Sequence, residues 1–186
     1  MSPVVKAALF RRIDRLELAV CLALNRICRL GSVESVFSAV SRLGDGVFWY
    51  VTLMLLPLLY GRMGLAAALH MTVVGLVAWS VYRLLKLGLM RVRPFMNAPG
   101  FRSNTAPLDD HSFPSGHTLH AVSFTLIGTH YVADLVWVLA PFTALVAASR
   151  VVLGLHYPTD VLAGGAIGMV LALASFGVLR PVLGFG

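Results

Sequence analysis

Long apolar runs dominate this sequence and leave little chain for anything else. Hydrophobic residues make up 58% of the 186 positions, charged residues only 12%, and the mean hydropathy is +0.83. A soluble domain carries about twice that charged fraction, whereas each membrane-spanning helix needs about 20 mainly apolar residues. We therefore predict an all-α, polytopic transmembrane helix bundle in which residues 1–186 form a single domain.

Five apolar runs predict the crossing helices, and an N-terminal helix makes six. The runs cover Val47 to Tyr60, Leu65 to Leu85, Thr118 to Val132, Leu135 to Leu155 and Val161 to Leu179. A short helix over 33–43, ending at Gly44, precedes the first run. The third should begin at Pro114, because proline is favoured in the first helical turn. Gly164 and Gly168, four residues apart, suit close helix packing.

The first 30 residues predict a basic amphipathic helix, with apolar side chains recurring every three or four residues from Phe10 to Ile27. Its uninterrupted apolar core, Leu18 to Leu24, is short for a span. A polar transmembrane helix and a helix lying in the membrane interface both fit this pattern.

The net charge of +7 raises the question of a nucleic-acid partner. The lysines and arginines stand at the ends of apolar runs and not along one polar face. We therefore expect them to set topology, contact headgroups and bind an anion, and we predict no nucleic-acid partner.

Three polar segments interrupt the apolar pattern. They are Lys86 with Arg93, then Ser115-Gly116-His117 after Pro114, then Arg150 with His156 and Asp160. The loop over 87–113 and the turn over 156–158 are separated by two spans, so both emerge on one side of the membrane. We therefore expect the three segments to meet.

The first two segments suit the binding of a phosphate. A lysine and a bidentate guanidinium match its several oxygens. The backbone amides of Ser115 and Gly116, at a helix start, would point at an anion, and His117 in the next turn is placed to protonate a leaving oxygen. Taken alone, each has a plainer interpretation: cations that snorkel to headgroups, or an ordinary helix start.

The third segment suits nucleophilic chemistry. An unpaired Arg150 near the end of a span would cost at least a few kcal/mol, so it should have an anionic partner. Asp160 can accept a hydrogen bond from one imidazole nitrogen of His156, which fixes the tautomer and leaves the other nitrogen free to attack. The plainer interpretation is an unrelated charge and histidine at helix ends.

Together the three segments resemble the tripartite signature of the type 2 phosphatidic acid phosphatase superfamily, which also includes glucose-6-phosphatase and the vanadium haloperoxidases. The match covers residues 86–160 in the family's order. The resemblance implies a phosphate cradle of Lys86, Arg93, Ser115, Gly116 and Arg150. It also implies a catalytic group of His156 as nucleophile, His117 as acid and Asp160 as the residue that orients His156.

The resemblance implies hydrolysis of a lipid phosphate through a phosphohistidine, with no metal or other cofactor. Short bacterial members suggest undecaprenyl pyrophosphate, phosphatidylglycerophosphate, phosphatidate or a lipid A phosphate as substrate. Two other functions stay open: a phosphotransferase that passes the phosphate to a second lipid, and a non-catalytic lipid transporter or scaffold. The oligomeric state is left open as well.

The membrane side of the site depends on the N-terminal helix. If that helix spans, its cations join Arg62 and Arg180 on one side, which the positive-inside rule makes cytoplasmic. If it lies on the surface, those cations share the side of the site and the rule points the other way. We expect the cell inner membrane with the site on the periplasmic face, because the family's core has six helices and cations within a site are not topology signals.

Overall fold

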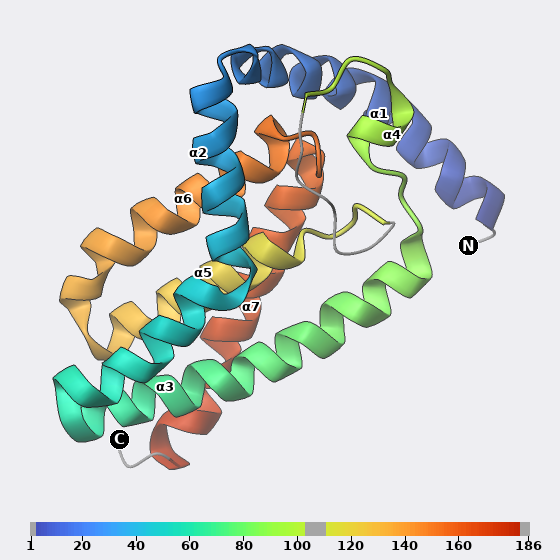
Figure 1. The fold of residues 1–186 in the computed structure, drawn as a ribbon. Helices are drawn as coiled ribbons and strands as arrows, with labels where there is room; N and C mark the ends of the chain where they lie inside the picture. The colour runs from blue at the N-terminus through green and yellow to red at the C-terminus, as the bar shows by residue number, and fades with distance from the viewer. Residues whose placement is uncertain (1–2, 103–110, 183–186) are drawn as a thin grey trace.

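The structure is a computed structural model that describes residues 3–102 and 111–182. These residues form a helical bundle (Figure 1). The α-helices are α1 (Pro3–Asn25), α2 (Gly31–Arg42), α3 (Phe48–Leu89), α4 (Pro94–Asn97), α5 (Gly116–Tyr131), α6 (Val136–Val152) and α7 (Pro158–Val182). Three short turns connect them: η1 (Arg26–Arg29), η2 (Leu43–Val47) and η3 (Ala133–Leu135).

The element α3 is a helical hairpin whose two arms match the first two predicted spans. Gly61 breaks the helix with φ 56° and ψ −130°, and the chain reverses there (Figure 1). The arms then pack closely, since a Cβ on Gly64 would overlap the carbonyl oxygen of Leu56. The first arm therefore ends directly after Tyr60, where the first predicted run ends.

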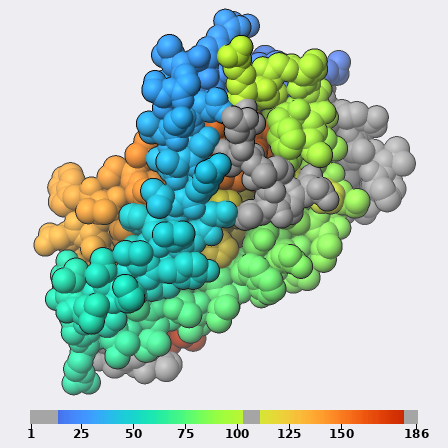
Figure 2. All heavy atoms as spheres, in the orientation of Figure 1, coloured from blue at the N-terminus to red at the C-terminus, as the bar shows by residue number. Residues whose placement is uncertain are grey.

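The predicted short helix over 33–43 is present as α2, but it does not end at Gly44. Its last turn continues through the π-helical turn η2 into α3. Within η2, the residue that departs from helical geometry is Gly46, whose φ is 150°. The segment formed by α2 and η2 is thus part of the bundle. Its blue and cyan atoms lie on the near surface in Figure 2.

Pro114 does not begin α5, contrary to the prediction. Ser115 is extended, with φ −73° and ψ 106°, and the helix begins at Gly116. The backbone N–H of Ser115 donates to the carbonyl oxygen of Asp160 at 3.0 Å, which holds this residue against α7 and outside the helix.

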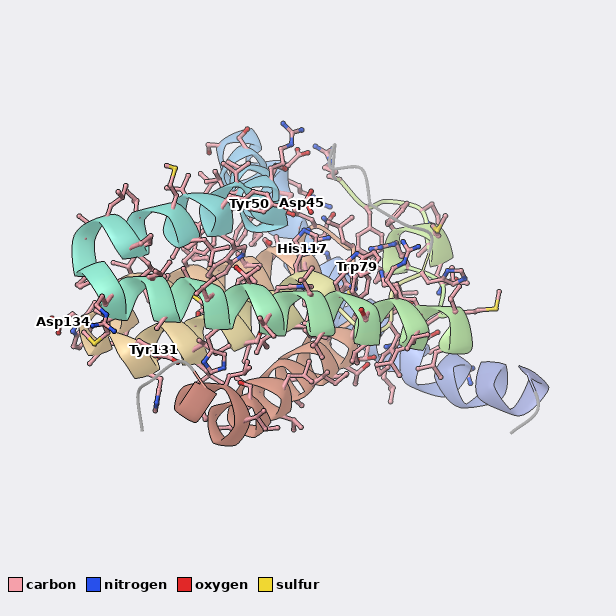
Figure 3. The ribbon with its side chains drawn as sticks, turned by 90° about the horizontal axis from the view of Figure 1, so that it is seen from below. Asp45, Tyr50, Trp79, His117, Tyr131 and Asp134 are labelled. Carbon is pink, nitrogen blue, oxygen red and sulfur yellow. The ribbon has the colours of Figure 1, made fainter. Side chains whose placement is uncertain are left out.

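Helix α1 lies across one end of the bundle. Within the described part of the chain, the side chains of residues 14–25 bond to residues at that end of the bundle. Asp14 bonds to Arg91, Glu17 to Thr159, and Asn25 to Val152 and Arg102. A helix that crossed the membrane would contact its neighbours at several depths. The structure therefore places α1 across the end of the bundle and not alongside its helices, as Figures 1 and 3 show.

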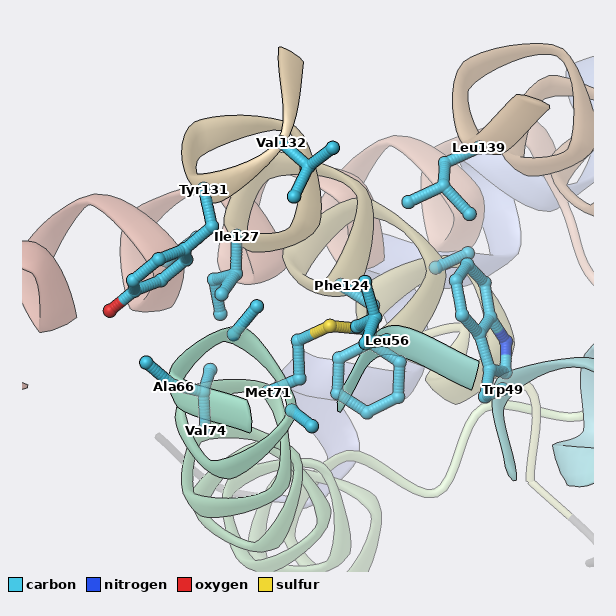
Figure 4. Close-up of a cluster of buried hydrophobic side chains, with 14 of the residues drawn as sticks. Trp49, Leu56, Ala66, Met71, Val74, Phe124, Ile127, Tyr131, Val132 and Leu139 are labelled. Atoms are coloured by element: carbon cyan, nitrogen blue, oxygen red, sulfur yellow. The ribbon is translucent and has the colours of Figure 1, made fainter. Parts of the chain in front are cut away.

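The apolar core fills the space between the arms of α3 and helices α5 and α6 (Figure 4). Trp49, Met71, Phe124, Ile127 and Leu139 lie at its centre and are buried. Outward-facing residues are apolar as well, such as Leu58 at 73% and Trp137 at 81% exposed. Three described segments are long and apolar enough to cross a membrane: Gly31–Leu89, Ala133–Val152 and Pro158–Leu179. Apolar residues on both faces fit lipid as the surrounding solvent.

Helices α5 and α7 pack through glycines, as predicted. A Cβ on Gly164 would overlap the carbonyl oxygen of Ser115, and a Cβ on Gly168 would overlap that of Leu119. This close approach brings the first turns of the two helices together, and those turns carry His117 and Asp160.

Gly168→Ala should destabilise the protein, because its Cβ would overlap the backbone of α5. Overpacking of this kind costs about 1–3 kcal/mol. The matched control is Gly165→Ala, whose Cβ would lie 3.7 Å from the nearest side-chain atom, of Val122. Thermal unfolding in detergent should show a lower melting temperature for Gly168→Ala only, and equal values for both variants would contradict this packing.

Candidate active site

A cavity of about 570 Å³ opens between η2, the arms of α3 and the start of α5. Six of the eight residues predicted for the site line it: Lys86, Arg93, Gly116, His117, Arg150 and His156. The cavity continues away from these residues between apolar and aromatic walls made by Trp49, Tyr50, Leu53, Leu76, Trp79, Tyr82 and Phe124. One end of the cavity is therefore cationic and the other is apolar.

His156 lies in the turn between α6 and α7, and this turn depends on a glycine. Gly154 has φ 69°, a conformation that favours glycine. The backbone amides of Leu155 and His156 both donate to the carbonyl oxygen of Arg150, at 3.0 Å. The turn therefore folds back on the end of α6 and holds the buried imidazole in the cavity wall.

The two ring nitrogens of His156 have different surroundings. Nδ1 lies 2.6 Å from the carbonyl oxygen of Ser112, so Nδ1 carries the proton and donates it there. Nε2 lies 3.4 Å from Nη1 of Arg93 and keeps its lone pair. Burial lowers the pKa of His156 well below its ordinary value, and the charges of Arg150, Arg93 and Lys86 lower it further. The imidazole is therefore neutral, as a nucleophile must be.

Asp160 does not accept the hydrogen bond predicted from His156. Its Oδ2 lies 3.8 Å from Nδ1, beyond hydrogen-bonding distance, and accepts instead from the backbone N–H of Tyr157 at 2.8 Å. Its Oδ1 accepts from Arg91 at 2.5 Å. The carbonyl of Ser112 orients His156 in place of Asp160. It is held there because the backbone N–H of Ser112 donates to the carbonyl oxygen of Arg91 at 2.8 Å.

Three buried cations surround the lone pair of His156. Lys86 donates to the carbonyl oxygen of His111 at 3.1 Å, and Arg93 to that of Leu155 at 2.8 Å. Arg150 donates to the hydroxyl of Ser41, on α2. Each of these three bonds runs to an uncharged oxygen and orients the cationic side chain. An anion with several oxygens, such as a phosphate, would complement them.

Ser115 does not line the cavity, although the sequence predicted it in the phosphate cradle. Its hydroxyl is 3.0 Å from that of Thr118, and its amide is bonded to the carbonyl oxygen of Asp160. Its side chain is fully buried. Gly116 alone of this pair lies in the cavity wall, where a Cβ would meet the ring of Tyr82 at 3.5 Å.

Sequence reasoning missed a buried ion cluster around Arg91. This guanidinium donates to Asp14 and Glu17 of α1 and to Asp160 of α7, and it stacks 4.1 Å from the ring centroid of Tyr157. Burial alone would lower the pKa of Arg91, but the three carboxylates outweigh burial and raise it. Two carboxylates three residues apart in an otherwise basic, amphipathic helix were the available signal.

Sequence reasoning also missed Asp45, in η2. Its Oδ1 lies 2.9 Å from Nε2 of His117, and both residues line the cavity. Figure 3 shows the two side chains together, far from Asp134, which lies at one end of the bundle. The signal was a carboxylate between two glycines directly before an apolar run.

Fold and cavity together define a polytopic membrane protein with a cavity lined by histidines and cations. The chain belongs to the PAP2 superfamily, which it matches over residues 59–181, more than half of its length. The sequence resemblance to this superfamily is therefore confirmed.

Curated relatives in this superfamily include lipid phosphatases. The chain is 28% identical over 116 residues to undecaprenyl-diphosphatase BcrC of Bacillus subtilis, and 33% identical over 103 residues to phosphatidylglycerophosphatase B of the same organism. The bacitracin transport permease protein BcrC of Bacillus licheniformis is 34% identical over 86 residues. These matches cover 45–61% of this chain but only 41–60% of the relatives.

Two solved structures share the fold over nearly the whole chain. LpxE of Aquifex aeolicus superposes with a TM-score of 0.70 at 23% identity, covering 87% of this chain and 95% of its own. The PAP2-type phosphatidylglycerolphosphate phosphatase of Bacillus subtilis superposes with a TM-score of 0.72 at 24% identity, covering 98% and 94%. The bundle is thus the fold of transmembrane PAP2 proteins.

Arg91→Lys should lower catalytic turnover about 10- to 100-fold, the usual cost of losing a supporting hydrogen-bond partner. A single ammonium cannot bridge Asp14, Glu17 and Asp160 as the planar guanidinium does, so the turn that holds His156 loses its support. The control is Arg26→Lys, on the exposed side of η1. Phosphate release by the two purified variants checks this, and unchanged turnover in Arg91→Lys would show that the cluster does not support the site.

Proposed function

We propose that this protein is an integral-membrane lipid phosphatase that works through a phosphohistidine on His156. The observation that carries the proposal is the unprotonated Nε2 of His156, which faces a cavity shared with Lys86, Arg93 and Arg150. A neutral nucleophile beside three cations matches the dianion of a phosphate monoester and the extra charge of its transition state.

The reaction runs in two displacements. The lone pair of Nε2 attacks phosphorus, the bond to the leaving oxygen breaks, and that oxygen takes a proton from His117. Water then attacks the phosphohistidine, gives a proton back to His117, and the bonding pair returns to Nε2 as inorganic phosphate leaves. Arg93, Arg150 and Lys86 hold the phosphate oxygens in both steps. Asp160 acts at a distance, by pairing with Arg91 and capping the turn at Tyr157.

A lipid substrate is supported by the apolar part of the cavity. The wall opposite the cations is formed by the exposed Tyr50, Leu76 and Trp79, which would face lipid tails in the bilayer. The names of the curated relatives suggest an undecaprenyl pyrophosphate or phosphatidylglycerophosphate, and a phosphatidylglycerolphosphate phosphatase shares the fold. We propose a lipid phosphomonoester or pyrophosphate of this group.

His156→Ala should abolish phosphate release, with a loss of about a thousandfold or more, because no other nucleophile replaces the imidazole. The matched control is His130→Ala, which removes an exposed imidazole at the opposite end of the bundle. Colorimetric phosphate assays on purified protein, with phosphatidate and a pyrophosphate lipid, measure both variants. Acid-labile label from a radioactive substrate should appear on the wild type only.

Turnover that survives His156→Ala would overturn the mechanism. Label that moves to a second lipid, with no release of inorganic phosphate, would show a phosphotransferase. Binding without any turnover by the wild type would show a transporter or scaffold.

We further propose the cell inner membrane, with the site on the periplasmic face. The cations of the cavity and Arg91 are engaged by the site and its carboxylates, so they are poor topology signals. Arg62, at the hairpin turn of α3, and Arg180, near the end of α7, then lie on the cytoplasmic side, as the positive-inside rule favours. Because α1 lies at the end of the bundle that carries the site, its own cations favour the opposite orientation, so this assignment needs a direct test.

Cysteine labelling should decide the side. Ser32→Cys lies at the site end of α2 and Arg62→Cys at the opposite end, and both positions are exposed, whereas the native Cys21 and Cys28 are buried. With a periplasmic site, a membrane-impermeant maleimide labels Ser32→Cys in intact spheroplasts and labels Arg62→Cys only after lysis. The reverse pattern would place the site in the cytoplasm, and the unaltered protein is the control.

A further inference from the structure

The carboxylate of Asp45 lies inside a stretch of chain long and apolar enough to cross the membrane, Gly31–Leu89. A charged side chain within a span is costly and marks a functional position by default. Asp45 sits on the π-helical turn η2, between Gly44 and Gly46. Turns of this type inside α-helices occur frequently at functional sites. The backbone thus departs from a regular helix at a place that lines the cavity, since Gly44, Asp45 and Gly46 all lie in its wall.

Close packing fixes the position of η2. A Cβ on Gly44 would lie 2.8 Å from Cγ2 of Val146, so the turn is pressed against α6. Gly46, with φ 150°, takes a conformation that other residues rarely adopt. One turn before Asp45, the hydroxyl of Ser41 accepts from Arg150. The same helix face therefore touches the phosphate-binding arginine and, through Asp45, the general acid.

Asp45 meets His117 directly, and it is placed to offset an unfavourable charge. Its Oδ1 is 2.9 Å from Nε2 of His117, whose side chain is 10% exposed. A protonated His117 shares the cavity with three cations and two further imidazoles: Lys86, Arg93, Arg150, His120 and His156. Among the described residues that line this cavity, one carries a carboxylate, and that residue is Asp45.

We propose that Asp45 is the positioning residue of the general acid: it orients His117 and stabilises its protonated form. The inference rests on the proposed function, because it needs His117 to donate a proton. In the first displacement the imidazolium gives one proton to the leaving oxygen and becomes neutral. In the second, the attacking water returns one proton and the imidazolium forms again. Asp45 stays ionised throughout and accepts from the Nε2–H of His117 in both states, so the proton that moves is the one on Nδ1.

The proposal makes a different demand on each class of substrate. An alkoxide needs a proton to leave, whereas a phenolate leaves without one. Asp45→Asn should therefore lower kcat for phosphatidate about 30- to 100-fold with little change in KM, as expected for a lost supporting carboxylate. For p-nitrophenyl phosphate in the same detergent, the change should stay within about threefold. Because both rates come from one preparation, their ratio does not depend on the folded fraction.

Three companion variants sharpen the test. Asp45→Glu keeps the carboxylate and should recover part of the phosphatidate turnover. His117→Ala should show the same substrate selectivity, and adding Asp45→Asn to it should cost nothing further, since the two residues act as one unit. Asp134→Asn, at the far end of the bundle, is the matched control and should behave as the wild type (Figure 3).

The outcomes separate this inference from the proposed function. Equal losses for both substrates in Asp45→Asn would show a purely structural role and overturn the inference. Undiminished phosphatidate turnover in Asp45→Asn, together with a loss in His117→Ala, would overturn it while leaving the phosphatase mechanism in place. Undiminished phosphatidate turnover in His117→Ala would instead remove the general acid from the proposed function itself.

Discussion

Three buried cations beside one neutral imidazole are the constraint on which this structure depends. Lys86, Arg93 and Arg150 are at most 8% exposed; Lys86 and Arg93 each donate to a backbone carbonyl, and Arg150 donates to a hydroxyl. Buried charge is costly unless something compensates it. The carbonyls come from the loop before α5 and the turn before α7, so the same bonds that orient the cations also fix the two segments that carry the histidines. Binding an anion would then complete an arrangement that is already in place.

The bundle positions these segments by close helix contact and not by a large polar interface. Glycines let α5 and α7 approach until Cβ atoms would overlap backbone. Helix α1 lies across the end of the bundle and covers it from outside. Its polar side chains bond there to Arg91, Thr159 and Val152. Its opposite face is apolar, with Leu16 at 73% and Leu30 nearby at 65% exposed. Through Glu17, α1 holds the start of α7, directly after the turn that carries His156.

Much of this could be predicted from the sequence, because the bilayer leaves few alternatives. The spacing and length of the apolar runs predicted the helices. The even number of spans between the polar segments predicted that Lys86, His117 and His156 lie on one side of the membrane. The partners could not be predicted, since they depend on backbone geometry. Nothing in the sequence shows that Ser112 offers its carbonyl to His156 at 2.6 Å while Asp160 stops at 3.8 Å. Ser115 was misplaced for the same reason: its amide is bonded to Asp160 and is not free for an anion. The ion cluster could not be predicted either, because Arg91 lies more than 70 residues from Asp14 and Glu17 in the sequence and meets them only in the folded chain.

The two histidines of the site are held in opposite ways, and the difference follows from their chemistry. A nucleophile must be neutral. The partner of His156 is the carbonyl of Ser112, whereas the nearby carboxylate of Asp160 is paired with Arg91. A carbonyl fixes the tautomer without favouring the imidazolium. A general acid must hold a proton, and His117 has a carboxylate in direct contact. The carboxylate of Asp45 favours the imidazolium of His117 against burial and the charge of Arg150, which lower the pKa of that histidine. The irregular turn η2 and the ion cluster on Arg91 are, in this light, two halves of one arrangement that keeps the carboxylates apart.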